Sequence, residues 1–203
     1  MKNSIVVIGG GESGVGAAFL ANKNGYDVFL SEFNTIQKKY KKILENNQIN
    51  YEEGGHTLAK FFNAKEVVKS PGISNNSEII IKIKSKNIPI ISEIEFAYRF
   101  TNSILIGVTG SNGKTTTCSL IYHILKNSGK SVGLAGNIGN SFSFLTAENN
   151  FEYVVLELSS FQLEDIINFH PFISIITNLT PDHLERYNYD FQNYVNSKFK
   201  IIS

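Results

Sequence analysis

Two stretches of this chain repeat one arrangement, and that arrangement restricts the fold more than any other feature. In residues 4–25 and again in residues 103–130, a run of apolar and β-branched residues enters a glycine-rich turn, and a helical pattern follows. A short strand pattern comes after each helix, "DVFLS" in the first case and "SVGLAG" in the second. Strand–helix–strand units of this kind build parallel sheets. The sequence therefore predicts an α/β protein with two parallel-sheet units.

The remaining patterns place the border between the two units near Ser92. A strand pattern, "IPIIS", runs there into a helical pattern that would carry the chain from one sheet to the next. We therefore expect a first domain over residues 1–92 and a second over residues 93–203. Two further apolar runs, "FEYVVLELSS" and "FISIITNLT", are typical of central parallel strands. The chain then ends on a helical pattern with no closing strand, so we expect the second domain to be incomplete.

Composition excludes several classes of protein. Lysine and arginine number 19 against 18 acidic residues, which gives no clustered basic charge for a nucleic-acid partner. Cys118 is the single cysteine, so an internal disulfide is excluded and a reducing compartment is indicated. No apolar run reaches the roughly 18 residues that a membrane span needs. We expect a cytoplasmic protein without membrane insertion.

The first glycine turn has the spacing of a diphosphate-binding turn. Gly9, Gly11 and Gly14 form G-x-G-x-x-G between a strand and a helix. Glycines allow a tight turn, and the amides at the start of the helix then face an anion. Glu32 ends the next strand, where an acid can accept a hydrogen bond from a sugar hydroxyl. The alternative is a glycine-rich turn without a ligand.

The second glycine turn indicates a nucleoside triphosphate. The sequence "TGSNGKTTT" lacks the full G-x-x-x-x-G-K-[ST] pattern, because position 108 is valine. The shorter core G-x-x-G-K-T, residues 110–115, is intact. In such a loop the amides surround the phosphates, Lys114 reaches the β and γ oxygens, and the hydroxyl of Thr115 binds Mg²⁺.

Three later residues are open to two interpretations each. Glu157 ends an apolar strand, where a carboxylate can bind Mg²⁺ or can simply be a solvated acid. His183 follows another strand in "NLTPDHLERY" and, taken alone, is more typical of a structural hydrogen bond than of a metal ligand. Lys198, taken alone, is typical of a solvated surface lysine.

Taken together, these motifs resemble those of the Mur ligase family. The segments "TGSNGKTTT", "GNIGNS", "LELSSFQLE" and "NLTPDHLERY" occur in the family's order and spacing, and "KSPGI" and "GGGESGVG" fit its N-terminal domain. The resemblance covers all 203 residues. It implies a Rossmann-like N-terminal domain that binds a UDP-linked substrate, followed by a P-loop-type central domain that binds ATP and Mg²⁺. The segment "ELSSFQLE" resembles the branch of the family that adds D-glutamate to UDP-N-acetylmuramoyl-L-alanine.

The resemblance also implies roles for individual residues. Lys114, Glu157, His183 and a carbamylated Lys198 would be the catalytic set, with Mg²⁺ ions held by Thr115, Glu157, His183 and Lys198. ATP would contact the loop residues Gly110, Ser111, Asn112, Gly113, Lys114, Thr115 and Thr116. The UDP-linked substrate would contact Gly11, Glu12, Ser13, Gly14, Glu32, Ser70, Pro71 and Gly72, and further along Asn137, Ser159, Gln162 and His183.

In this family the substrate carboxylate takes the γ-phosphoryl group of ATP, and the amine of D-glutamate then displaces phosphate. The intact protein is expected to act as a monomer in peptidoglycan precursor synthesis. Family members have a third domain, so we expect the 203 residues alone to bind substrate without turnover. Two alternatives stay open: a non-catalytic nucleotide-binding remnant, and an NAD-dependent oxidoreductase that uses the first glycine turn and Glu32.

Overall fold

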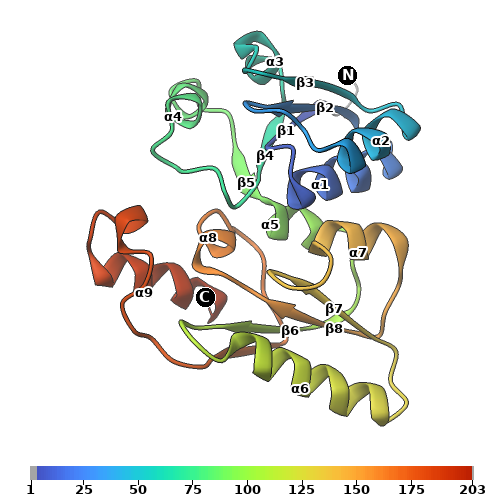
Figure 1. Cartoon of the computed structure of the whole chain (residues 1–203), viewed down its shortest axis with the longest axis vertical. Helices are drawn as coiled ribbons and strands as arrows, with labels where there is room; N and C mark the ends of the chain where they lie inside the picture. Colours follow the sequence, from blue (N-terminus) through green and yellow to red (C-terminus); the bar gives the residue numbers. More distant parts are fainter. Residues whose placement is uncertain (1–3, 203) are drawn as a thin grey trace.

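A computed structural model describes residues 4–202 of the chain (Figure 1). The outermost residues of the two expected domains, 1–3 and 203, lie outside this range. Within it the strands form two parallel sheets. The first has the order β3-β2-β1-β4-β5, with β1 (Ser4–Ile8), β2 (Asp27–Glu32), β3 (Asn50–Glu53), β4 (Glu66–Lys69) and β5 (Ile90–Ser92). The second has the order β7-β8-β6-β9, with β6 (Ile104–Thr109), β7 (Val132–Gly136), β8 (Tyr153–Glu157) and β9 (Ile173–Ile176).

Helices connect the strands and cover the sheets. In the first half these are α1 (Glu12–Lys23), α2 (Lys38–Asn46), α3 (Leu58–Phe62), α4 (Glu78–Lys84) and α5 (Glu93–Tyr98). In the second half they are α6 (Lys114–Asn127), α7 (Phe142–Glu148), α8 (Ser160–Leu163) and α9 (Phe191–Phe199), with 3-10 turns η1 (Leu184–Tyr187) and η2 (Lys200–Ile202). The predicted α/β fold with parallel sheets is confirmed.

One apolar core continues from the first sheet into the second. Figure 1 shows α1, α5 and α7 between the two sheets, and α1 packs against both α5 and α7. Buried side chains on β1, α5 and β8, such as Val7, Phe96 and Leu156, belong to the same cluster. The helix α6 lies on the opposite face of the second sheet. Because α5 follows the last strand of the first sheet, we propose to keep the domain border near Ser92.

The strand orders place ligand-binding crevices where the sequence has its glycine turns. In the first sheet the chain leaves β1 for β2 on one side and returns to β4 on the other. In the second it leaves β6 toward β7 and β8 and returns to β9 on the other side. Ligands of open parallel sheets bind outside the carboxyl ends of the strands at such reversals. Both glycine turns, residues 9–14 and 110–113, lie at these points.

Two buried glutamates at the start of α5 join the halves of the chain. Glu95 Oε2 accepts hydrogen bonds from the amides of Ile167, Asn168 and Phe169 at 2.8–2.9 Å. Glu93 Oε1 accepts from the amide of Ser143 at 2.6 Å, whereas Glu93 Oε2 is buried without a partner. Burial raises the pKa of Glu93 to about 7, against the hydrogen bonds from Ser143.

Because the pKa of Glu93 is raised in the folded chain, we expect the free energy of unfolding to fall as the pH rises. Unfolded Glu93 loses its proton near pH 4.5 and folded Glu93 near pH 7, so the folded chain holds the extra proton between these values. The free energy of unfolding then decreases across this window, by roughly 3 kcal/mol. A glutamine in place of this acid keeps the acceptor oxygen and cannot ionise. We expect Glu93→Gln to melt near the wild-type temperature at about pH 5 and well above it at about pH 8.

Thermal denaturation followed by circular dichroism measures this difference. Glu152→Gln is the matched control, because Glu152 is half-exposed in a surface ion pair with Lys130. The control should shift little at either pH. A Glu93→Gln melting temperature offset from wild type by the same amount at both pH values would contradict the assignment.

Candidate functional site

The loop between β6 and α6 forms a tight anion-binding turn. Gly110 has φ +142°, and a Cβ there would lie 2.0 Å from Oγ1 of Thr177, so no other residue fits. Gly113 is the N-cap of α6 with φ +82°. The α6 N-terminus, with its free amides and its positive dipole end, therefore opens toward the carboxyl edge of the sheet.

Two lysine side chains meet at this loop. Lys114 Nζ donates to the carbonyl oxygens of Gly110 and Ser111, each at 2.8 Å. Lys198 Nζ, from α9, donates to the same Gly110 oxygen at 2.9 Å. Lys198 is 2% exposed, which corrects the interpretation of it as a solvated surface lysine. Burial, and next the charge of Lys114, lower the pKa of Lys198 to about 8, while Asp182 opposes the shift.

A threonine and a buried carboxylate meet beside the loop. Oγ1 of Thr115 donates to Glu157 Oε2 at 2.7 Å. Glu157 Oε1 accepts from Nδ2 of Asn137 at 2.8 Å, and the Glu157 carbonyl accepts from the Asn137 amide at 2.8 Å. Glu157 is 1% exposed, so the alternative of a solvated acid is wrong. The structure thus brings together a hydroxyl and an anionic oxygen, which are hard ligands.

His183 lies in a different set of contacts. Its ring is about half-exposed, 3.6 Å from a carboxylate oxygen of Asp182 and 3.8 Å from one of Glu185. The ring centroid lies 5.1 Å from that of Phe161. In residues 4–202 no group of three or more His, Cys, Asp or Glu side chains is clustered as a metal site. The predicted metal set is therefore joined only in part: Thr115 with Glu157, and Lys198 with the loop.

Ser159 and Gln162 have a structural role that we did not predict. They form a capping box at the start of α8: Ser159 Oγ accepts from the Gln162 amide, and Gln162 Oε1 accepts from the Ser159 amide at 2.9 Å. The spacing S-x-x-Q in "SSFQ" is the sequence signature of this cap. Gln162 is 3% exposed, and its bonds to Ser159 fix the start of α8 three residues after Glu157.

Two residues that were not predicted from the sequence shape the loop between β6 and α6. Asn178, two residues past β9, accepts from the Asn112 amide through Oδ1 at 2.9 Å and from the Ser111 amide through its carbonyl at 3.0 Å. Tyr194 on α9 shares a hydrogen bond of 2.8 Å between its hydroxyl and Ser111 Oγ. The amides of Ser111 and Asn112 therefore donate to Asn178, whereas the amides at the start of α6 can face a ligand. Thr116, also predicted to contact ATP, is exposed on this end of α6.

The first glycine turn is equally tight. A Cβ on Gly14 would lie 1.9 Å from the carbonyl oxygen of Gly9, so α1 starts in direct contact with the turn. Glu32 closes it: Oε2 accepts from the Gly10 amide at 2.5 Å and Oε1 from the Asn34 amide at 2.7 Å. Ser70 Oγ is buried beside Gly9 and has no partner. An orphaned hydroxyl at this crevice fits a ligand oxygen.

Of the other predicted substrate contacts in the first half of the chain, all lie around this turn, but the side chain of Glu12 turns away from it; Asn137, Ser159, Gln162 and His183 lie in the second half. Gly11 caps α1 and Ser13 follows in its first turn. Pro71 and Gly72 continue the chain from Ser70. The side chain of Glu12 instead points to the other half of the chain, where Oε1 accepts from the Ser141 amide at 2.9 Å.

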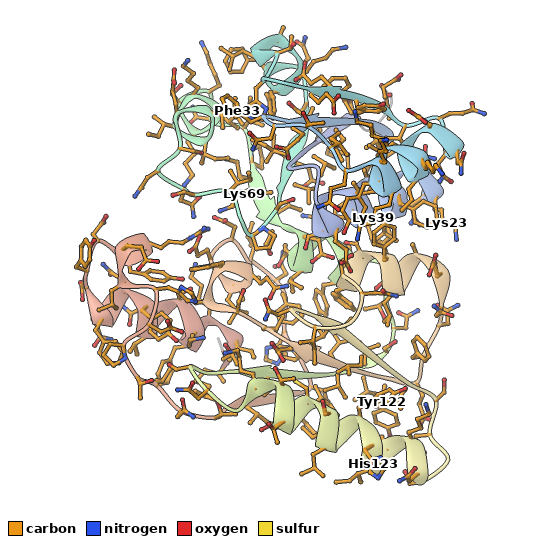
Figure 2. All side chains as sticks on the ribbon, viewed as in Figure 1. Lys23, Phe33, Lys39, Lys69, Tyr122 and His123 are labelled. Carbon is orange, nitrogen blue, oxygen red and sulfur yellow. The ribbon has the colours of Figure 1, made fainter. Side chains whose placement is uncertain are left out.

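A pocket of about 510 Å³ opens next to the turn. Its walls include Phe33 after β2, His56 after β3 and the segment 72–74 after β4. Figure 2 labels Phe33 in the first half of the chain, well away from the second sheet. The Phe33 side chain is 65% exposed, which leaves one aromatic face open to a planar ligand.

The carboxyl-edge loops of the two sheets also face each other. Asn75, after β4, donates to Glu164 at 3.2 Å, and Arg186 donates to the Ile73 carbonyl at 3.1 Å. Both glycine turns lie at these facing carboxyl edges, after β1 and after β6. This arrangement allows a ligand bound at one turn to extend toward the other.

Comparison with protein families assigns both halves of the chain. A model of the MurD N-terminal domain matches residues 4–79, and a model of the Mur ligase middle domain matches residues 108–203. The chain belongs to the Mur ligase family. The resemblance found in the sequence motifs is thus confirmed.

Curated Mur ligases are similar to almost the whole chain. A UDP-N-acetylmuramoylalanine–D-glutamate ligase of Christiangramia forsetii is 53% identical over 201 residues, which are 99% of this chain and 45% of that protein. One of Bacteroides fragilis is 54% identical over 197 residues, 97% of this chain and 44% of that protein. The chain therefore spans about 45% of the length of these relatives.

Solved structures of Mur ligases share the fold. The UDP-N-acetylmuramate–alanine ligase of Thermotoga maritima superposes with a TM-score of 0.61 at 25% identity, covering 98% of this chain and 46% of that one. The UDP-N-acetylmuramate:L-alanyl-γ-D-glutamyl-meso-diaminopimelate ligase of Neisseria meningitides gives a TM-score of 0.65 at 20% identity, covering 100% and 69%, and shows the fold alone. In residues 4–202 no helix has both the length and the apolar character of a membrane span.

Proposed function

We propose that this Mur ligase chain is part of an ATP-dependent ligase that adds D-glutamate to UDP-N-acetylmuramoyl-L-alanine in the cytoplasm, for peptidoglycan precursor synthesis. The observation that carries the proposal is the pair of glycine turns at the carboxyl edges of the two sheets, the first near a nucleoside-sized pocket and the second beside two lysines. The relatives that are about half identical carry this activity in their names. An NAD-dependent oxidoreductase leaves the Lys114 loop and the buried Glu157 without a role.

The loop of residues 110–116 is proposed to bind the phosphates of ATP. Lys114 would exchange its contacts with the Gly110 and Ser111 carbonyls for the β and γ oxygens. The amides at the start of α6 would face the same oxygens. Asn178 and Tyr194 would keep the first half of the loop in place during this exchange.

The residues present fit a magnesium site. Thr115 and Glu157 supply a hydroxyl and a carboxylate whose oxygens lie 2.7 Å apart, close enough to share one cation. When bound, Mg²⁺ neutralises phosphate charge and polarises the γ-phosphoryl group. His183 and Lys198 are proposed for the second cation, with Lys198 carbamylated by CO₂ on its neutral amine. A crystal of the wild-type protein with ATP and Mg²⁺ that showed a bare Lys198 amine at full occupancy would exclude the carbamate.

The first domain is proposed to bind the UDP part of the substrate. The diphosphate would lie at the turn of residues 9–14, within reach of the orphaned Ser70 hydroxyl, and the uracil ring in the pocket beside Phe33. The lactyl-alanine arm would then reach Asn137, Ser159 and Gln162 after β7 and β8. There the alanyl carboxylate meets the γ-phosphate.

Positive charge at this point makes the chemistry feasible. The carboxylate oxygen attacks the γ-phosphorus and ADP leaves, which gives an acyl phosphate. The amine of D-glutamate then attacks the acyl carbon, loses a proton, and phosphate departs. Two anions must approach each other in the first step, and Lys114 offsets their repulsion in a partly buried site.

An assay with purified components tests the proposal. The intact protein should release ADP only when UDP-N-acetylmuramoyl-L-alanine and D-glutamate are both present. We propose that residues 1–203 alone bind UDP without turnover, and calorimetry with UDP and with NAD separates these ligands. D-glutamate-dependent ADP release by the 203-residue chain would contradict the predicted absence of turnover. Binding of NAD but not UDP would contradict the proposed UDP site and favour the oxidoreductase. If the intact protein binds both UDP and ATP but shows no turnover, it is the non-catalytic nucleotide-binding remnant.

A further inference from the structure

The turn that carries His183 has a backbone that its own residues do not favour. His183, Asn188 and Tyr189 have φ of 49°, 55° and 59°, in the left-handed region. Residues other than glycine adopt this conformation uncommonly, and three of them in one turn indicate that contacts from elsewhere hold it. The His183 side chain contributes little, because it is about half-exposed and its charged neighbours Asp182 and Glu185 lie on the same turn.

Arg186, three residues later, supplies such contacts. Its Nε and Nη2 donate to the two carboxylate oxygens of Glu164, each at 2.8 Å. Nη2 also donates to the carbonyl of Ile73 at 3.1 Å. The guanidinium carbon lies 4.2 Å from the ring centroid of Phe161, the same ring that contacts His183. The Arg186 side chain is 13% exposed, so these interactions are weakly screened.

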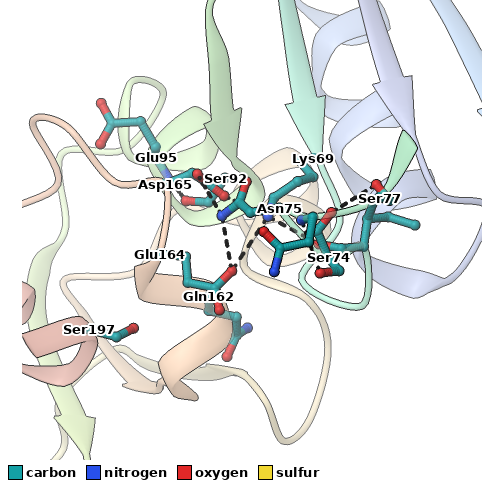
Figure 3. Close-up of polar contacts among 12 residues, drawn as sticks. Lys69, Ser74, Asn75, Ser77, Ser92, Glu95, Gln162, Glu164, Asp165 and Ser197 are labelled. Carbon is teal, nitrogen blue, oxygen red and sulfur yellow. Dashed lines mark hydrogen bonds and ion pairs between the residues drawn. The ribbon is translucent and has the colours of Figure 1, made fainter. Parts of the chain in front are cut away.

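The Glu164 carboxylate is itself held by the first half of the chain. Asn75 Nδ2 donates to Glu164 Oε2 at 3.2 Å and to Asp165 Oδ1 at 3.3 Å. Lys69, 1% exposed, lies 3.6 Å from Glu164 and 2.7 Å from Asp165. Figure 3 shows these side chains gathered where the loop after β4 meets α8. Two cations, Arg186 and Lys69, thus balance two carboxylates at the junction of the domains.

We propose that Arg186 is a positioning residue that fixes His183 relative to the phosphate loop and couples it to the loop after β4. The inference rests on the proposed function, in which His183 serves the second cation. Only an arginine fits the role, because its planar fork binds both oxygens of Glu164 and lies flat on Phe161. A lysine keeps the charge and loses both features.

The test compares two arginine-to-lysine variants of the intact protein. Arg186→Lys should lower kcat by roughly 10- to 100-fold and raise the Mg²⁺ concentration that gives half-maximal activity, as for other residues that orient metal ligands. The KM for ATP should stay within about twofold, since the Lys114 loop is untouched. Arg99→Lys is the matched control: Arg99 forms an ion pair with Glu66 at 2.7 Å, outside the site, and should show wild-type kinetics.

Amide hydrogen exchange gives a readout without turnover. In the absence of ligands, exchange of residues 183–190 should be faster in Arg186→Lys than in wild type or Arg99→Lys, whereas the α6 amides should be unchanged. Glu164→Gln, which removes the same ion pair from the other side, should act in the same direction, and the double variant should be no worse than the stronger single one. If Arg186→Lys does not fold, Glu164→Gln alone decides.

The inference would be overturned if folded Arg186→Lys, or folded Glu164→Gln, had the kcat, the Mg²⁺ requirement and the exchange rates of the wild type. An intact wild-type protein without D-glutamate-dependent ADP release would instead overturn the proposed function, and the exchange experiment would still report whether Arg186 holds the turn. The two failures are therefore distinguishable.

Discussion

Replacing Lys114 with alanine is expected to lower the kcat of the proposed ligase reaction of the intact protein by at least about 100- to 1000-fold, the range for removing one preorganised donor to transition-state charge. The amine lies 2.8 Å from two carbonyls of the loop that is proposed to bind the ATP phosphates. Its charge matters most when the carboxylate and the γ-phosphate approach each other. Steady-state ADP release with saturating substrates measures the effect.

Lys126→Ala provides the matched control for this prediction. Lys126 lies in the last turn of the same helix, α6, and contacts the ring of Tyr122 on the surface. Its loss should change kcat by less than about twofold, because surface substitutions remote from a site have small effects. An undiminished kcat in Lys114→Ala would refute the role of the loop in phosphoryl transfer.

Replacing Glu157 with glutamine should also abolish most of the activity, through loss of a metal ligand and not of a lysine charge. The glutamine side chain would keep the shape and the contact with Thr115 while losing the anionic oxygen that is proposed to bind Mg²⁺. A metal ion contributes several kcal/mol of charge stabilisation, which corresponds to about 100-fold or more in rate. The variant should remain folded, because removing a charge that is 1% exposed relieves a desolvation cost. Part of the rate should return at high Mg²⁺ concentration.

The matched control is Glu152→Gln, just before the same strand β8. Glu152 forms a half-exposed ion pair with Lys130 at 3.1 Å and lies at the opposite end of the strand from the site. It should retain wild-type kcat and Mg²⁺ dependence. A Glu157→Gln variant with the same Mg²⁺ dependence as Glu152→Gln would show that Glu157 does not bind the metal.

Much of the fold was predictable because the strands that carry the glycine turns are strongly apolar. The runs at residues 4–8, 104–109 and 153–157 are strands, and the helical pattern at the end of the chain forms α9 at residues 191–199. The strand at one edge of the first sheet, β3, was not predicted. Strand β3 consists of Asn50, Tyr51, Glu52 and Glu53. These residues are polar or aromatic, and their side chains are exposed or only partly buried, so no apolar pattern marks the strand.

The positions of the candidate site residues were predictable where they directly follow an apolar strand. The glycines and Lys114 follow β6, and Glu157 ends β8. Arg186 and Asn178 escaped prediction because their roles depend on partners far along the chain, Glu164 at the end of α8 and the loop at Asn112. Glu12 illustrates the converse: its neighbours suggest a ligand contact, and its carboxylate binds the Ser141 amide. Pairings of this kind are set by how the two sheets pack.

In the proposed reaction, the carboxylate of the UDP-linked substrate and the γ-phosphate of ATP meet at the carboxyl edge of the second sheet and react directly. Substrate labelled with ¹⁸O in the alanyl carboxylate, incubated with the intact protein, ATP and D-glutamate, tests it by mass spectrometry of the released phosphate. We predict that each phosphate carries one oxygen from the carboxylate, because that oxygen bridges carbon and phosphorus in the acyl phosphate. Release of unlabelled phosphate alongside the amide product would contradict the account.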